Sequence, residues 1–199
     1  MLKERIDKLV KESNHAIIIG SRGKGKTCLG YYLLELHKNA KRDIYIYNHP
    51  KPSILPKWIK NVTRLEHLPN NAVVLIDEGA ADFDQYSYKK RTNIYLRNRL
   101  MKARHKNQSY IFITLVTNFI NLNFLHMINA WFFKQPTLFQ KEEERKIVRQ
   151  AYMKIEEELK KDEFYYMDDE EFVKGMFKKP KWYTEEISKA YSDVDAEMI

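Results

Sequence analysis

Cysteine is almost absent from this 199-residue sequence, and glycine and proline are scarce. The single cysteine, Cys28, excludes a disulfide bond within the chain and fits a reducing compartment. Six glycines and six prolines exclude a long flexible linker or a low-complexity tract. The first residues are charged and contain no apolar segment of the kind found in signal peptides. We therefore expect a globular protein without a signal peptide.

Charged side chains are missing from residues 109–133. A transmembrane helix needs about 20 mainly apolar residues, but this stretch also contains amide, hydroxyl and imidazole side chains, which are unfavourable in lipid. The sequence therefore predicts no transmembrane segment. It predicts a buried strand, a polar turn, a short helix and a second buried strand.

Charge is distributed unevenly along the chain. Residues 151–199 contain 8 Lys/Arg and 14 Asp/Glu, a net charge of −6, whereas residues 1–150 contain 27 and 13, a net charge of +14. A strongly basic region favours a polyanionic partner. The alternative is that the charge serves solubility alone.

Continuous apolar runs alternate with helical patterns along the first 134 residues. Apolar or β-rich runs cover residues 16–19, 43–47, 72–76, 110–114 and 130–133, and the main helical patterns cover 2–13, 28–36 and 88–106. Residues 50–71, which contain four of the six prolines, are expected to form a loop with a short helix, and residues 140–161 are expected to form a helix. Strands that are buried on both faces have this appearance, and the alternation favours a parallel sheet. We predict an α/β fold with a mostly parallel sheet flanked by helices. The expected division is a core of residues 1–140 and a helical, acidic extension of residues 141–199, packed on the core or on a neighbouring subunit.

Residues 20–27 read GSRGKGKT and match the pattern G-x-x-x-x-G-K-[ST] between a predicted strand and a predicted helix. Glycines let such a loop point its backbone N–H groups at phosphate oxygens, and the helix that follows adds its positive end. The alternative is an ordinary glycine-rich turn. The sequence predicts an ATP site made of Gly20, Ser21, Arg22, Gly23, Lys24, Gly25, Lys26, Thr27 and Cys28, in which Cys28 is a small packing residue at the helix start.

A pair of acidic residues, Asp77 and Glu78, ends the apolar run of residues 72–76. We predict that Asp77 and Thr27 hold Mg²⁺ and that Glu78 is the general base that activates water. A carboxylate beside the metal ligand favours hydrolysis over a kinase reaction, whose acceptor supplies its own nucleophile. The alternative is that both acids merely cap a turn.

Three further residues are candidates for catalysis. Thr114 ends the next predicted strand, where it could contact the γ-phosphate or could simply terminate the strand. Arg99 and Arg104 lie in a basic helix, and either could act in a neighbouring subunit as an arginine finger. A solvated basic face is the alternative for each arginine.

These motifs together resemble the FtsK/HerA division of the additional-strand P-loop ATPases. Within it the chain is most similar to small viral genome-packaging ATPases and to Zot-like phage assembly ATPases. The resemblance covers residues 16–134 and rests on residues 20–27, 73–78, 104–107 and 110–114. One departure is Leu115, which stands where such families have a sensor glutamine; Thr117, Asn118 and Gln135 are candidates to replace it.

The resemblance implies an ATP-hydrolysing motor that translocates double-stranded DNA through a ring of five or six subunits. It also implies a location in the host-cell cytoplasm or with the virion, and a capsid or membrane-vesicle protein as a further partner. The alternatives are a Zot-like assembly or secretion ATPase, a nucleotide kinase and a binding module without activity. The aromatic, acidic residues 164–199 are expected to pack on their own domain; docking on another subunit or on a capsid protein is the alternative.

Overall fold

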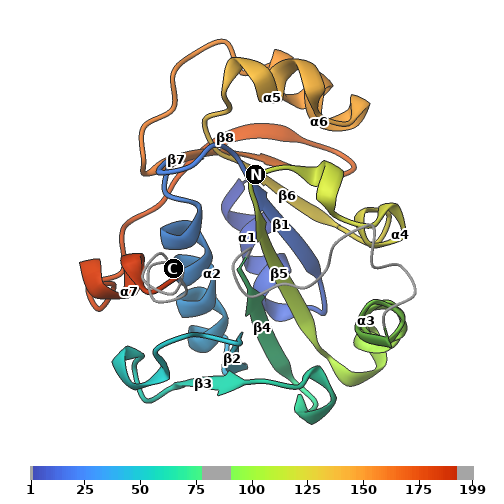
Figure 1. The fold of residues 1–199 in the computed structure, drawn as a ribbon, viewed down its shortest axis with the longest axis vertical. Coiled ribbons are helices and arrows are strands. Elements are labelled where there is room, and N and C mark those ends of the chain that lie inside the picture. The colour runs from blue at the N-terminus through green and yellow to red at the C-terminus, as the bar shows by residue number, and fades with distance from the viewer. Residues whose placement is uncertain (1, 78–90, 192–199) are drawn as a thin grey trace, which may run out of the picture.

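The computed structural model describes residues 2–77 and 91–191. A sheet of eight strands runs through the molecule in the order β3-β2-β4-β5-β1-β6-β7-β8 (Figure 1). The strands are β1 (His15–Ile19), β2 (Asp43–Tyr47), β3 (Ile59–Val62), β4 (Ala72–Ile76), β5 (Ser109–Thr114), β6 (Ala130–Phe133), β7 (Glu163–Met167) and β8 (Phe172–Met176). The helices are α1 (Leu2–Lys11), α2 (Lys26–Asn39), α3 (Arg91–Lys102), α4 (Leu122–Leu125), α5 (Leu138–Glu143), α6 (Lys146–Met153) and α7 (Glu185–Lys189).

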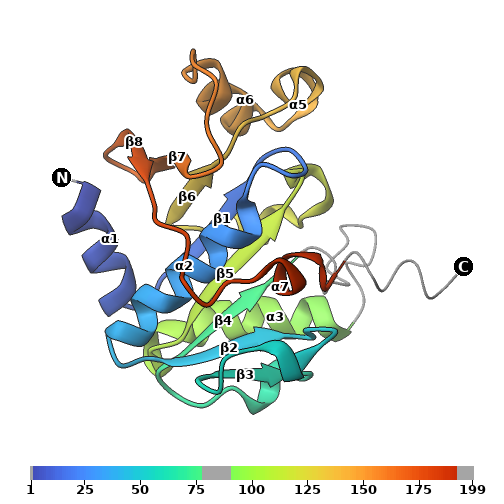
Figure 2. The ribbon, with the colours of Figure 1, turned by 90° about the vertical axis from the view of Figure 1, so that its left-hand side faces the viewer.

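The first six strands are parallel, and β1 lies between β5 and β6. Alternate residues of β1 enter two separate apolar cores. Ile17 and Ile19 pack with α3, α4 and α6, while Ile18 packs with α1, α2 and α7. Figures 1 and 2 show these two groups of helices on opposite sides of the sheet. Burial on both faces explains the continuous apolar runs, and the predicted α/β fold is confirmed.

Some elements differ from the prediction. The proline-containing segment of residues 50–71 was expected to be a loop with a short helix, but it also supplies the edge strand β3. The predicted helix of residues 140–161 is two short helices, α5 and α6, and ends at Met153. The basic helix predicted for residues 88–106 is α3 followed by a 3₁₀ turn, Ala103–Lys106; residues 88–90 lie outside the described part.

The C-terminal extension departs most from the expected helical structure, because residues 163–176 form the antiparallel hairpin β7–β8. Successive side chains of β7 point to opposite faces of the sheet, and this alternation favours a strand. Phe164 and Tyr166 are buried, and the ring centroid of each lies 5.4 Å from that of Phe132 in β6. Tyr165, which points to the other face, stacks on Phe172 at 4.9 Å. The sheet therefore continues across residue 140, the predicted boundary of the core.

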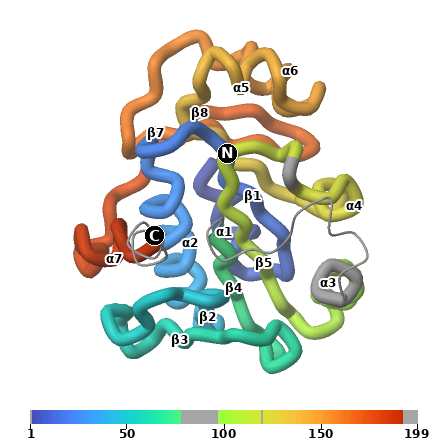
Figure 3. The backbone as a smooth tube through the Cα atoms, viewed as in Figure 1, coloured from blue at the N-terminus to red at the C-terminus, as the bar shows by residue number. Residues whose placement is uncertain are grey.

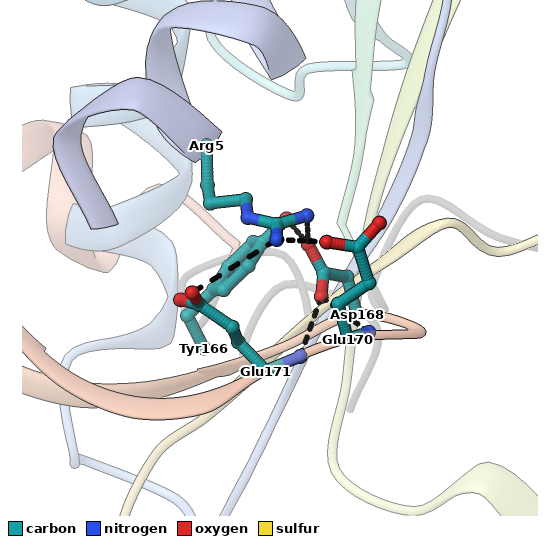
Figure 4. Close-up of polar contacts among 5 residues, drawn as sticks. All are labelled: Arg5, Tyr166, Asp168, Glu170 and Glu171. Carbon is teal, nitrogen blue, oxygen red and sulfur yellow. Dashed lines mark hydrogen bonds and ion pairs between the residues drawn. The ribbon is translucent and has the colours of Figure 1, made fainter. Parts of the chain in front are cut away.

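An ion-pair cluster fastens the hairpin turn to the N-terminal helix (Figure 4). Arg5 Nη1 of α1 donates to Asp168 Oδ2 at 3.1 Å, and Arg5 Nη2 donates to Glu170. Asp168 also accepts a 3.0 Å bond from the Tyr166 hydroxyl and a 2.9 Å bond from the Glu171 amide. Part of the acidic charge of the C-terminal region is thus paired with a basic residue of the same chain.

After β8 the chain runs back along α2 to α7 (Figure 3). Phe177 packs on Tyr32 of α2 at 5.5 Å between ring centroids, and Tyr183 packs on Tyr31 at 5.3 Å. The indole N–H of Trp182 donates to Glu35 Oε1 at 2.9 Å. This path brings residues 177–191 to the carboxyl edge of the parallel strands.

Candidate active site

A tight loop joins β1 to α2 and contains three glycines with positive φ, namely Gly20, Gly23 and Gly25. A Cβ atom on Gly20 would lie 2.7 Å from Lys134 Cβ, and one on Gly25 would lie 2.6 Å from the Lys161 carbonyl oxygen. Both positions therefore require glycine for space as well as for conformation. No side chain caps the start of α2 at Gly25, so the N-terminal N–H groups of this helix can bind an anion.

The side chains of Lys26 and Thr27 lie at the centre of this loop. Lys26 is buried, and its Nζ donates to the carbonyl oxygens of Gly20 (2.9 Å) and Ser21 (3.1 Å). The Thr27 hydroxyl donates to Asp77 Oδ2 at 3.2 Å. The structure thus brings together three of the predicted site residues: an ammonium, a hydroxyl and a carboxylate.

Asp77 directly follows β4, which is separated from β1 by β5 alone. Because parallel strands end at the same edge, the sheet itself places Asp77 beside the loop. Glu78, the predicted general base, lies outside the described residues.

The other predicted loop residues have distinct surroundings. Ser21 donates both its N–H (2.9 Å) and its hydroxyl (2.7 Å) to the Gln135 carbonyl, which ties the loop to the segment after β6. Lys24 Nζ lies 3.7 Å from Glu158 Oε1. Arg22, Gly23 and Cys28 line the cavity described below.

Thr114 is the last residue of β5 and lies in register with Ile19, immediately before the loop. It is buried, and its hydroxyl donates to the Val116 carbonyl at 2.8 Å. Its position is therefore close to the loop, and its hydroxyl is engaged within the turn that ends the strand.

Arg99 and Arg104 are at the opposite edge of the sheet. Arg99 Nη2 donates to the Glu66 carbonyl at 2.7 Å, in a turn that precedes β4. Arg104 is exposed in the 3₁₀ turn that precedes β5. The structure does not bring either arginine to the loop of its own chain.

The segment after β5 is held by the α5–α6 region. Leu115, which stands at the predicted sensor position, reaches the cavity, and its carbonyl accepts a 2.6 Å bond from Gln140 Nε2. Thr117 is buried, and its N–H donates to both carboxylate oxygens of Glu144 at 3.1 Å. Gln135 Oε1 accepts from the Leu159 amide at 2.7 Å. The side chains of Thr117 and Gln135 thus have partners away from the loop.

Sequence reasoning missed Lys134, which follows β6. Its side chain is fully buried, and its Nζ donates to the carbonyl oxygens of Lys161 (2.9 Å), Lys160 (3.4 Å) and Glu163. Burial lowers the pKa of the Lys134 ammonium to about 8. This lysine fixes the turn of residues 160–163 against the glycine loop. The sequence feature that could have identified it is a lysine directly after an apolar strand, at the edge of the sheet where the predicted site lies.

The loop opens into a cavity of about 850 Å³. Its near wall contains Lys26, Thr27, Asp77 and Leu115. Its far wall comes from the C-terminal region, which sequence reasoning did not connect with the site; the residues are Lys161, Asp162, Phe177, Lys179, Tyr183, Ser188, Lys189 and Tyr191. The volume is in the range of small-molecule sites.

No protein-family model and no curated protein matches the sequence. Solved structures do. The genome-packaging NTPase B204 of Sulfolobus turreted icosahedral virus 2, in complex with ATP-gammaS, is similar with a TM-score of 0.61 and 16% identity over 83% of this chain and 97% of B204. The chain has the fold of a P-loop NTPase. Residues 20–27, which match the P-loop pattern and join β1 to α2, are called the P-loop below.

Two further solved structures are similar to this chain. The pCW3 conjugation coupling protein TcpA has a TM-score of 0.63 and 14% identity over 84% of this chain and 60% of TcpA. The cytoplasmic domain of EssC has a TM-score of 0.55 and 13% identity over 83% of this chain and 38% of that one. The resemblance predicted from the P-loop and its neighbouring strands is thus confirmed at the level of the fold.

Within the described residues, no helix combines the length and the apolar character that a bilayer span requires.

Proposed function

We propose that this chain is an ATP-hydrolysing motor that translocates double-stranded DNA, of the kind that packages viral genomes. The observation that carries the proposal is the contact between Thr27 and Asp77 beside the buried Lys26 ammonium. This arrangement combines a phosphate cradle with a pair of oxygen ligands for a metal. B204, which has the same fold, is described as a DNA-packaging ATPase.

The P-loop would bind the triphosphate through its backbone amides and the start of α2. Lys26, now bonded to two loop carbonyls, would neutralise the β- and γ-phosphates. The buried position of the ammonium favours this role, because screening by water is weak there.

The donor set fits Mg²⁺. The Thr27 hydroxyl and the Asp77 carboxylate are hard oxygen ligands, and Mg²⁺ in phosphate sites takes one or two carboxylates together with substrate phosphates and water. Bound there, the ion would neutralise charge that develops on the phosphates.

Hydrolysis requires a base for the attacking water. Glu78, which follows Asp77 in the sequence, would accept a proton from water while the water oxygen bonds to the γ-phosphorus and the bond to ADP breaks. Arg99 and Arg104 lie far from the P-loop of their own chain. A role as arginine finger would therefore require a neighbouring subunit. The proposed assembly is a ring of five or six copies of this chain.

The expected DNA contacts are electrostatic. The net charge of +14 on residues 1–150 suits phosphate contacts, which carry no sequence information. We propose binding that tolerates any sequence and weakens steeply with salt. A capsid or membrane-vesicle protein would be a further partner, at the cytoplasmic or virion site of assembly.

Hydrolysis is tested by the release of phosphate from MgATP. We expect Lys26→Ala to lose turnover by about 100-fold or more and Glu78→Gln to keep ATP bound while turnover stalls. Lys57→Ala, a change at an exposed lysine outside the cavity, is the control and should leave turnover unchanged. Full activity of both site variants would overturn the mechanism.

Translocation is tested by adding double-stranded DNA of unrelated sequences at low salt. We expect stimulated ATP hydrolysis that does not depend on sequence and disappears as salt is raised. Hydrolysis that stays constant on adding DNA to the assembled ring would retain an ATPase but exclude this motor.

A further inference from the structure

The C-terminal segment of residues 177–191 forms part of the cavity that the P-loop opens into. In the proposed function, the triphosphate binds to the P-loop, Lys26 and Thr27, and the metal ion binds to Asp77. One further part of the cavity wall, in the C-terminal region, has no role in these contacts. It contains Phe177, Lys179 and Tyr183.

We propose that Phe177, Lys179 and Tyr183 form a nucleoside subsite, which binds the base and ribose of the nucleoside triphosphate whose phosphates lie in the P-loop. This inference rests on the proposed nucleotide binding and extends it to the part of the ligand that the P-loop does not recognise.

Chemistry supports this assignment. The Tyr183 ring lies against Tyr31, and Lys179 Nζ lies over the Tyr183 ring at 5.6 Å. Lys179 is exposed, so its side chain can move aside or donate to ribose and base oxygens and nitrogens. Aromatic side chains bind bases of any kind by stacking.

The segment is built into the fold before any ligand arrives. Trp182 is bonded to Glu35 and packs edge-on against Trp58, with ring centroids 5.1 Å apart. Thr184 caps α7 by accepting from the Ile187 amide, and Ile187 is buried. A fixed wall lowers the ordering entropy that binding must overcome.

The far end of the segment adds an unpaired polar group to the cavity. Tyr191 packs edge-on against His49, and its hydroxyl is buried without a hydrogen-bond partner among the described residues. A buried hydroxyl without a partner is unfavourable, which suits a cavity that is completed by a polar ligand or by water.

A second part of the C-terminal wall is also held in place by the fold. The turn of residues 160–163, fixed by Lys134, touches Gly25 of the P-loop and contributes Lys161 and Asp162 to the cavity. Lys134 Nζ also lies 5.1 Å from the centre of the Phe177 ring. Lys134 is thus a positioning residue that joins the P-loop, the turn and the proposed subsite.

The test compares MgATP with magnesium tripolyphosphate, which lacks the nucleoside, by calorimetric titration of the full chain. We expect Tyr183→Leu and Lys179→Ala each to weaken ATP binding by about 5- to 50-fold. Tripolyphosphate binding should stay within about two-fold of the wild type, since those contacts are retained. Lys178→Ala, at the adjacent exposed lysine outside the cavity, should change neither affinity.

The outcomes separate the two proposals. Equal weakening of ATP and tripolyphosphate would overturn the nucleoside subsite, as would unchanged ATP affinity in both variants, while the proposed function would survive. Failure of the wild-type chain to bind either compound would overturn the proposed function itself. Circular dichroism of each variant, with thermal melting, identifies any loss that comes from unfolding.

Discussion

The P-loop and the C-terminal segment face the same cavity but are built in different ways. The P-loop depends on local backbone geometry: glycines with positive φ and the start of a helix supply its binding groups. The C-terminal segment depends on contacts between residues far apart in sequence, such as Trp182 with Glu35 and Phe177 with Tyr32. The geometry of the P-loop is thus encoded locally, while the rest of the cavity wall exists only in the complete fold.

The largest expected loss of stability is at Gly25, where the P-loop lies against the turn of residues 160–163. Gly25→Ala places a Cβ atom 2.6 Å from the Lys161 carbonyl oxygen, whereas Gly23→Ala meets nothing within 4 Å. Both changes carry the strain of positive φ, about 1 kcal/mol. We expect Gly25→Ala to lower the free energy of unfolding by about 3 kcal/mol, the excess coming from the clash. Denaturant titrations of both variants measure it, and equal losses would show that the contact is unimportant.

The second prediction concerns the turn after β5. Contacts with Gln140 and Glu144 hold this turn, which brings Leu115 to the cavity. Glu144→Ala leaves the Thr117 N–H and hydroxyl without their acceptor in a buried place. We expect a loss of about 2 kcal/mol in the free energy of unfolding. Glu143→Ala, at an exposed neighbour, should lose less than about 0.5 kcal/mol. Chemical denaturation compares them; similar values would contradict a structural role for Glu144.

The contact between Lys134 and the C-terminal region is expected to make the stability of the protein depend on pH. Burial lowers the pKa of Lys134 to about 8 from the ordinary 10.5, so between these values the unfolded chain holds a proton that the folded chain has released. Stability rises with pH wherever the unfolded state binds more protons. We expect the free energy of unfolding of the wild type, relative to Lys134→Met, to rise by about 1 kcal/mol between pH 8 and pH 9. A flat or falling difference in denaturant titrations at these two pH values would be inconsistent with this account.

The smallest expected effect is at Trp182. Trp182→Phe keeps an aromatic ring against Tyr31 and Trp58 but removes the donor to Glu35. We expect a loss of about 1 kcal/mol, measured by thermal melting. Glu35→Gln, which keeps an acceptor oxygen, should lose less. A larger loss in Glu35→Gln would indicate that charge, not the hydrogen bond, is important here.

Most of the parallel sheet and the P-loop could be predicted from sequence, for reasons that are local. The runs that became β4 and β6 are apolar at every position because both of their faces are buried, and the P-loop is a contiguous pattern. The hairpin β7–β8 could not be recognised, because its strands mix aromatic with charged residues and acquire their pairing from β6.

The same distinction applies to the site. The proximity of Asp77 to Thr27 follows from strand order in a parallel sheet, which the alternation of strands and helices indicates. Nothing near Tyr183 or Lys179 in the sequence shows that they reach the cavity. Their place depends on how the chain returns along α2, and that path is determined by contacts with residues about 150 positions earlier, such as Glu35.

The position of the 160–163 turn against Gly25 has a consequence for biosynthesis. During translation the P-loop leaves the ribosome before the residues that surround it, because Lys134, Lys161 and Tyr183 all follow it in the chain. A nascent chain would therefore expose its glycine loop without the surrounding wall. Tight capture of nucleotide would begin only when translation has passed the C-terminal segment.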